Sequence, residues 1–298
     1  MLQNSVNQLT IALLCGGKSK ERQVSLDSGK AIAASLEKLS YNYHMIDPDD
    51  HLIDNLLKLK PDLVFNALHG TYGEDGRIQG LLDIMQIPYT HSGVLSSALA
   101  FNKKIAKDIF TANNINCPKG MTVSIKELFA QLKAKNYPIK PPFVIKPLTE
   151  GSSLGVYIVD DKFDFVGSNI ETDWKFGTKA IIEQYIAGKE ISVAVLNGKS
   201  LGAIEIVPVK GFYSYDNKYI DGNAEHIYPA PVSKKIYDLA IEIAEKVHEL
   251  FYCKNISRCD FRYDPDEGPD GTLYILELNT HPGMTNLSIV PKTAEHAG

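Results

Sequence analysis

The stretch IALLCGGKSKERQVSLDSGKAIAASLEKL, residues 11–39, decides the fold of the first part of the chain. It opens with a short apolar run at residues 11–14, which Gly16 and Gly17 close. Apolar side chains then recur at helical spacing: Val24, Ile32, Leu36 and Leu39. A strand followed by a glycine turn and a helix is typical of an α/β layer. The sequence therefore predicts that the chain begins with a strand–turn–helix unit.

A second unit of the same kind follows. Residues 63–68 read as a buried strand, HGTYGEDG at 69–76 as a glycine-rich loop, and residues 77–85 as a helix. We predict a small parallel α/β domain over residues 1–102. We expect two further α+β domains beyond it, at 103–186 and 187–298.

Residues 95–112, which span the boundary between the first and second domains, are predicted to be helical, with the lysines from 103 to 107 on a solvated face by default. A strand at 143–146, a loop at 147–153 and a strand ending at Val159 follow, and residues 160–178 are expected at the surface.

The last domain has a strongly β pattern. Asn197-Gly198 predicts a tight hairpin, and residues 208–231 predict a long functional loop. The remaining predicted elements are strands at 180–186, 190–196, 201–207, 257–263 and 272–279 and a helix at 236–250.

Composition excludes several classes of protein. The chain has 298 residues, with 31 basic and 36 acidic side chains and a net charge of −5, which argues against a nucleic-acid-binding surface. No apolar run approaches the ~18 residues that a membrane span needs. The 4 cysteines are scattered and form no C-x-x-C pair, so neither a disulfide framework nor a zinc site is expected. We expect a soluble, cytoplasmic protein that binds no membrane.

The last two predicted strands carry the sharpest constellation of polar residues. Side chains alternate along a strand, so Arg258 shares a face with Asp260, and Glu277 shares a face with Asn279. Pairing Asp260 with Glu277 would gather all four on one face. Carboxylate and amide oxygens suit Mg²⁺. The alternative is a solvated hairpin face with an ion pair.

Three loops are further candidates for a site. Lys146 and the loop at 150–153 offer a point charge, a glycine and hydroxyls to a phosphate, although this segment taken alone favours a plain turn between two strands. His69 ends a strand where α/β proteins bind ligands, but a lone histidine is more often structural. Glu21 either holds a substrate ammonium or helps to start the following helix.

Four stretches together, at residues 13–29, 64–103, 144–156 and 275–291, resemble the D-alanine–D-alanine ligases of the ATP-grasp superfamily. The resemblance implies an ATP-grasp fold with ATP between the central and C-terminal domains. It implies the reaction ATP + 2 D-Ala → ADP + phosphate + D-Ala-D-Ala, through a D-alanyl phosphate, for peptidoglycan precursor synthesis. It also implies a homodimer formed through the N-terminal domain.

The resemblance assigns residues of this sequence to the nucleotide. Its two Mg²⁺ or Mn²⁺ ions would be held by Asp260, Glu277 and Asn279. The phosphates would contact Lys103, Lys146 and Lys218, and the adenosine would contact Glu183 and Glu190.

It assigns others to the amino acids. Glu21 would take the ammonium of the first D-Ala, and His69 would lie by its carboxylate. The oxyanion would be stabilised by Arg258 and the backbone of Gly283, and the second D-Ala would be received by Ser288 and Ile289. A lid network would join Glu21, Ser152 and Tyr219. His281, inside the last stretch, departs from the expected pattern.

Two other functions remain open from the sequence. One is an ATP-grasp ligase that uses a different acid and amine, for which Glu21, His69 and Ser288 are the discriminating residues. The other is a regulatory ATP-binding module with a decayed site. The intact metal-site constellation speaks against the second, since a decayed site has no reason to keep it.

Overall fold

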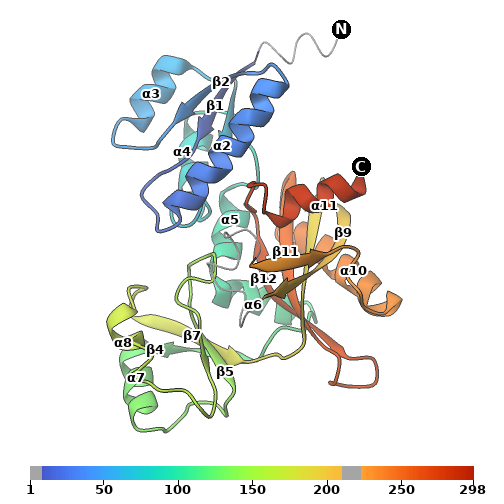
Figure 1. Cartoon of the computed structure of the whole chain (residues 1–298). Helices are drawn as coiled ribbons and strands as arrows, with labels where there is room; N and C mark the ends of the chain where they lie inside the picture. The colour runs from blue at the N-terminus through green and yellow to red at the C-terminus, as the bar shows by residue number, and fades with distance from the viewer. Residues whose placement is uncertain (1–8, 210–222) are drawn as a thin grey trace.

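The computed structural model describes residues 9–209 and 223–298 and contains three β-sheets, each in its own lobe (Figure 1). Lys218 and Tyr219, which the sequence assigns to the phosphates and the lid, lie outside the described residues. The parallel α/β start and the two α+β parts are confirmed as element types. The domain boundaries stay predictions.

The N-terminal lobe is a three-stranded parallel sheet in the order β2-β1-β3. The predicted strand–turn–helix unit is confirmed, and the inward face of β1 is fully buried at Leu14. The carboxyl ends of β1 and β3 meet at one edge, which places the loops that carry Glu21 and His69 side by side. The elements of this lobe are β1 (Thr10–Leu14), α2 (Arg22–Lys38), β2 (Asn42–Ile46), α3 (Leu52–Leu59), β3 (Leu63–Asn66) and α4 (Arg77–Ile84).

The predicted helix at 95–112 is two helices, α5 (Val94–Phe101) and α6 (Lys103–Ala112). Asn102 breaks the run with an extended backbone (φ −89°, ψ 101°), and its side chain accepts hydrogen bonds from the backbone N–H groups of Lys104 and Ile105. A side-chain cap of this kind satisfies the free amides of a new helix start. Lys103 therefore stands in the first turn of α6.

The second lobe is a four-stranded antiparallel sheet in the order β4-β7-β5-β6. The expectation that 160–178 is all surface is wrong in part, because Phe165, Ile170 and Trp174 are buried against Phe129 and its neighbours. Aromatic area of this size outweighs the charged composition of the segment. The elements are β4 (Gly120–Ser124), α7 (Ile125–Lys133), β5 (Phe143–Pro147), β6 (Tyr157–Val159), α8 (Ile170–Asp173) and β7 (Lys179–Gln184).

The third lobe is a five-stranded antiparallel sheet in the order β10-β9-β8-β11-β12, and it packs on the largest core cluster, which includes α5 and α6 residues. The Asn197-Gly198 hairpin is confirmed, with both residues at positive φ (50° and 78°). A short strand, β10, lies inside the segment predicted as loop. The elements are β8 (Lys189–Leu196), β9 (Lys199–Pro208), β10 (Ala224–Ile227), α10 (Lys234–Leu250), β11 (Ile256–Asp264), β12 (Thr272–Asn279) and α11 (Ile289–Ala297).

The register of β11 and β12 is the predicted one. Arg258 lies opposite Asn279 and Asp260 opposite Glu277. A bulge between Asp260 and Phe261 shifts the pairing immediately beyond them. Bulges re-aim side chains next to functional sites, and Arg262 beyond this one lines the same pocket as Asp260.

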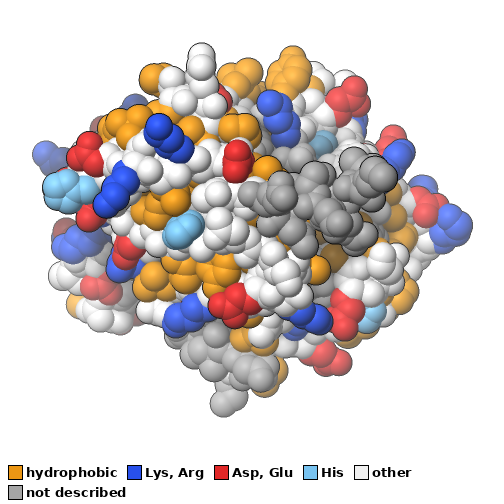
Figure 2. Space-filling model, turned by 90° about the horizontal axis from the view of Figure 1, so that it is seen from above, with side chains coloured by type: hydrophobic (Ala, Val, Ile, Leu, Met, Phe, Trp, Pro, Cys, Tyr) orange, Lys and Arg blue, Asp and Glu red, His pale blue; other side chains and the backbone are white. Residues whose placement is uncertain are grey.

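The molecular surface is mixed in charge. On the face in Figure 2, basic and acidic side chains are interspersed, and no stretch of this face is uniformly basic. Among the helices of residues 9–209 and 223–298, none has the length and apolarity to cross a bilayer.

Candidate active site

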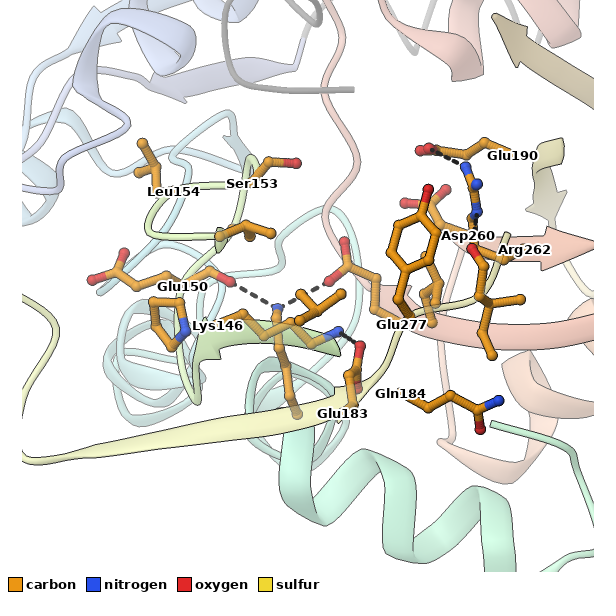
Figure 3. Close-up of a pocket in the computed structure, with 18 residues that line it drawn as sticks. Lys146, Glu150, Ser153, Leu154, Glu183, Gln184, Glu190, Asp260, Arg262 and Glu277 are labelled. Atoms are coloured by element: carbon orange, nitrogen blue, oxygen red, sulfur yellow. Dashed lines mark hydrogen bonds and ion pairs between the residues drawn. The ribbon is translucent and has the colours of Figure 1, made fainter. Parts of the chain in front are cut away.

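A pocket lies between the four-stranded and five-stranded sheets (Figure 3). One wall comes from β5, the loop after it and the end of β7, and the other comes from β8, β11 and β12. It contains every described residue that the sequence assigns to phosphate or adenosine, with the two predicted metal-binding carboxylates: Lys103, Lys146, Glu183, Glu190, Asp260 and Glu277.

Glu183 forms the centre of a buried ion-pair cluster. Its Oε2 lies 2.7 Å from Lys107 Nζ, and its Oε1 pairs with Lys146 Nζ. Burial by itself would raise the pKa of Glu183, but the two ammonium groups outweigh burial and hold that pKa below its ordinary value. Burial lowers the pKa of Lys146 despite Glu183. The default expectation of a solvated lysine face is wrong for Lys107, whose side chain is only 8% exposed.

Lys103 ties three parts of the site together. Its Nζ lies 2.9 Å from Glu277 Oε2 on β12 and donates to the backbone carbonyl of Glu150 at 2.8 Å. Burial favours the neutral amine, yet the Glu277 carboxylate prevails and raises the pKa of Lys103. The ammonium is therefore charged at neutral pH and faces the loop that follows β5.

Asp260 is held by hydrogen bonds on both oxygens. Arg258 donates to it from Nε at 2.8 Å and from Nη2 at 2.7 Å, Ser192 donates at 2.6 Å, and the Asn279 amide donates at 3.1 Å. The ion pair therefore joins neighbours on one strand rather than crossing the hairpin. A bidentate guanidinium–carboxylate pair fixes both side chains in place.

The donor set suits Mg²⁺ that shares its coordination with a nucleotide. Within the described residues, no group of three or more His, Cys, Asp or Glu side chains is placed to bind a metal. Asp260 and Glu277 are cross-strand neighbours, and Asn279 adds one amide oxygen. Two carboxylates with phosphate oxygens and water match the way Mg²⁺ is held in nucleotide sites. The residues present fit the ion in that form.

A second pocket adjoins the first and shares Gly151 and Glu277 with it. It lies between the N-terminal lobe and the segment after β12. It gathers the described residues that the sequence assigns to the amino acids: Glu21, His69, Ser152, Arg258, Asn279, Gly283, Ser288 and Ile289.

Glu21 is the buried acid of the second pocket. Its Oε2 accepts a hydrogen bond from the Ser152 hydroxyl, while its Oε1 is buried with no hydrogen-bond partner among the described residues. Burial, with a contribution from Glu74, raises the pKa of Glu21 to about 7. The absence of a side chain at Gly151 permits this contact, since a Cβ there would lie 2.8 Å from Glu21 Oε1.

His69 is oriented from both ring nitrogens. Nδ1 lies 3.0 Å from the Glu74 carboxylate, which only accepts hydrogen bonds, so Nδ1 carries a proton. Nε2 lies 3.0 Å from the Ser28 hydroxyl. The ring is 4% exposed and lines the second pocket.

The segment after β12 completes the pocket. Ser288 is the N-cap residue of α11. Its hydroxyl accepts a hydrogen bond from the Thr285 backbone N–H at 3.0 Å. A Cβ at position 283 would lie 2.9 Å from Ser288 Oγ and would displace this hydroxyl. Gly283 itself lines the pocket.

Replacing Glu21 by Gln is expected to stabilise the protein at high pH. A carboxyl whose pKa rises on folding, here to about 7, binds its proton more tightly in the folded state. Folding stability is then lost as pH rises from about 4.5 to about 7. The variant lacks this loss, so its unfolding free energy should exceed that of wild type by up to about 3 kcal/mol at pH 8, and by little at pH 4.

Urea unfolding at pH 4 and pH 8 measures the effect of Glu21→Gln. Asp54→Asn, on the exposed face of α3, is the matched control and should show no such pH-dependent gain. Equal differences between Glu21→Gln and wild type at both pH values would show that the acid does not titrate in this range.

Sequence reasoning missed several supporting residues. Lys107 has a signal, because it follows Lys103 by four positions and so shares its helix face. Glu74 lies in the same 69–76 loop as His69, five residues further on, whereas Ser192 has no local signal, since Asp260 is 68 residues away on another strand.

Two family models match this chain. The D-ala D-ala ligase C-terminus model matches residues 109–298, and the D-ala D-ala ligase N-terminus model matches residues 48–92. The first alone covers more than half of the chain.

Relatives match over nearly the full length. A D-alanine–D-alanine ligase of Wolbachia pipientis wMel is 48% identical over 290 residues, which are 97% of this chain and 89% of that protein. One of Rickettsia massiliae is 47% identical over 298 residues, covering 99% of this chain and 89% of that protein.

Solved structures of ligases are also similar to this chain, both in fold and in sequence. The D-alanine–D-alanine ligase from Bacillus anthracis complexed with ATP is 31% identical, with a TM-score of 0.78 over 97% of this chain and 92% of that one. The VanG D-Ala:D-Ser ligase from Enterococcus faecalis is 27% identical, with a TM-score of 0.76 over 97% and 95%. The chain belongs to the D-alanine–D-alanine ligase family of ATP-dependent ligases.

Proposed function

We propose that this chain joins two D-alanines with conversion of ATP to ADP and phosphate. One of the two adjoining pockets binds the nucleotide, and the other binds the amino acids. The observation that carries the proposal is their meeting at Glu277 and Gly151. The first pocket offers lysines and acidic oxygens to a nucleotide, and the second offers a buried acid and an arginine to an amino acid. Phosphoryl transfer between the two ligands needs this adjacency.

The nucleotide lies in the first pocket. Lys103 and Lys146 contact its phosphates, as Lys218 does from the segment outside the described residues. Glu183 and Glu190 contact the adenosine. Asp260, Glu277 and Asn279 hold two Mg²⁺ or Mn²⁺ ions, which neutralise phosphate charge and align the transferred group when bound.

The first D-alanine lies in the second pocket. Its ammonium meets the partnerless Oε1 of Glu21, and the positive charge shifts Glu21 to its ionised form. Its carboxylate lies by His69. The second D-alanine is received by Ser288 and Ile289, at the start of α11. Tyr219 joins Ser152 and Glu21 to close a lid over both.

The reaction proceeds in two displacements. The carboxylate of the first D-alanine attacks the γ-phosphorus of ATP, which gives D-alanyl phosphate and ADP. The amine of the second attacks the acyl carbon, and phosphate leaves as the peptide bond forms. Arg258 and the Gly283 N–H stabilise the oxyanion between these events. The closed lid keeps water from the acyl phosphate.

ADP release with a panel of D- and L-amino acids, together with the mass of each product, tests the proposal. D-alanine should give the fastest ADP release and a product with the mass of D-Ala-D-Ala. ADP release without this dipeptide would favour another ATP-grasp ligase. No amino-acid-dependent ADP release would favour a binding module.

The acceptor should be an amino acid rather than a hydroxy acid. The lid residues Tyr219, Ser152 and Glu21 add no cation to the Arg258 already in this pocket, so the lid itself does not favour an incoming D-lactate anion. With equal D-Ala and D-lactate at pH 7, D-Ala-D-Ala should dominate. Adding D-Ser to the same mixture tests the acceptor named for the VanG relative. Predominant depsipeptide or D-Ala-D-Ser would overturn the acceptor assignment.

The enzyme works as a homodimer in the cytoplasm and supplies a peptidoglycan precursor. The four free cysteines suit a reducing compartment. Light scattering at micromolar concentration tests the dimer, and a strict monomer would refute it.

A further inference from the structure

Two buried histidines stack beside the second pocket. The rings of His91 and His281 lie 3.9 Å apart between centroids at an interplanar angle of 20°, and each residue is 4% exposed. His281 also meets the edge of His69 at 5.6 Å. His91 belongs to the N-terminal part of the chain, and His281 to the segment that follows β12.

The tautomer of His281 is set by the N-terminal lobe. Asn66 Oδ1 accepts from the Leu68 backbone N–H at 3.2 Å, and Asn66 Nδ2 donates to the Gly73 carbonyl at 3.1 Å. These two contacts fix the orientation of the amide. The same Nδ2 lies 3.3 Å from His281 Nδ1, so this nitrogen accepts and the proton is on Nε2.

A third contact holds the same segment. The backbone N–H of Met284 lies 3.5 Å from the Ser28 hydroxyl, which also contacts His69. His281 and Met284 therefore anchor both ends of a four-residue segment to the N-terminal lobe. Gly283, whose N–H is proposed to bind the oxyanion, lies between these anchors.

The two stacked rings have features that are energetically unfavourable for residues whose only role is to fill the core. His91 has a left-handed backbone (φ 72°), which is uncommon for residues other than glycine, although His, with Asn and Asp, adopts it more often than most. Its Nε2 is buried without a hydrogen-bond partner among the described residues. An aliphatic side chain would bury no such unpaired nitrogen. An imidazole at 281, unlike an aliphatic group, both stacks and accepts from Asn66.

We propose that His281 is a positioning residue: with His91 and Asn66 it fixes residues 281–284 against the N-terminal lobe and so sets the place of the Gly283 N–H. The proposal rests on the proposed function of Gly283. An oxyanion donor acts only in the transition state, so its displacement lowers kcat and leaves nucleotide binding intact.

The test compares variants of the full chain by steady-state ADP release with D-alanine. His281→Leu removes the ring and the acceptor, and kcat should fall ~10- to 100-fold while KM for ATP stays within ~2-fold. His281→Asn returns an acceptor to the position of Nδ1 and should recover most of the lost kcat. His51→Leu, on an exposed side chain, is the matched control.

His91→Gly acts on the stack from the other side, at a backbone angle that glycine adopts freely. It should also lower kcat, and the double variant with His281→Leu should be no slower than His281→Leu alone, because the two rings act as a unit. Thermal unfolding gives the folded fraction of each variant.

The possible results distinguish a failure of this proposal from a failure of the proposed function. A folded His281→Leu enzyme with kcat within about twofold of wild type would overturn the proposal, as would strictly multiplicative effects of the two single changes. If His281→Leu does not fold, a normal kcat in folded His91→Gly overturns it and a reduced one supports it. Wild type that forms no D-Ala-D-Ala in this assay would instead refute the proposed function.

Discussion

Replacing Glu277 by Gln is expected to lower turnover by at least ~10²-fold while the protein stays folded. Glu277 lies where the two pockets meet, opposite Asp260 on β11 and 2.9 Å from Lys103. The amide keeps the shape of the side chain but removes a negative charge from the proposed Mg²⁺ ligands. Charge neutralisation at the transferred phosphate then fails, and phosphoryl transfer slows.

Glu267→Gln is the matched control for Glu277→Gln, because Glu267 lies in the turn of the same hairpin and its carboxylate accepts from the Tyr274 hydroxyl, away from both pockets. Its kcat should stay within about twofold of wild type, and circular dichroism should match for both variants. Near-normal turnover in a folded Glu277→Gln variant would show that this face of the hairpin does not hold the metal.

Replacing Glu183 by Gln is expected to lower the free energy of unfolding by about 3–5 kcal/mol, because removing one member of a buried ion pair leaves an uncompensated charge. Here two ammonium groups lose their partner at once. Lys107 and Lys146 are each 8% exposed, and neither reaches solvent by a small movement. The same change should weaken ATP binding.

The loss of unfolding free energy in the Glu183→Gln variant should become smaller as pH rises from 7 toward 10. Burial already lowers the pKa of Lys146, and losing the carboxylate lowers it further. A lysine with a depressed folded pKa makes the unfolded state bind more protons, so stability rises with pH until both states are neutral.

Glu205→Gln is the control for Glu183→Gln. Glu205 is 9% exposed, but its partner Lys189 is 35% exposed and regains water when the pair is broken. The expected loss is about 1 kcal/mol or less. Urea unfolding of both variants at pH 7 and pH 10 measures the difference. Equal losses in the two variants would show that the Glu183 cluster is not effectively buried.

Local periodicity made much of the fold predictable. The apolar run at 11–14 with its glycines predicted β1 and the turn, and Asn197-Gly198 predicted the hairpin, because both signals depend on backbone geometry within a few residues. The shared face of Arg258 and Asp260, and that of Glu277 and Asn279, was predictable for the same reason, since alternation along a strand has a period of two. The pairing of Asp260 with Glu277 was an assumed register, which the structure confirms.

Apolar periodicity gave wrong predictions where a single side chain or a distant core determined the local structure. Apolar spacing runs through residues 95–112, yet the Asn102 cap splits the helix there. Residues 160–178 have a polar composition, yet Trp174 is buried because the α7 side of the four-stranded sheet offers it an aromatic cluster. Neither the cap nor that cluster changes the period of the sequence.

The sequence by itself determined the residues that we propose to meet ATP and D-alanine, since its motifs carry the carboxylates, lysines and glycines that this chemistry needs. Only the tertiary structure decided how those groups are charged and held. The sequence predicts that Lys107 is solvated, whereas in the structure it is paired with Glu183, 76 residues away. His281 departs from the expected sequence pattern, and its contact with Asn66, 215 residues away, is visible only in the structure. The physical reason is that hydrogen bonding and pKa depend on burial and on partners brought together by packing between lobes, and no local pattern records either.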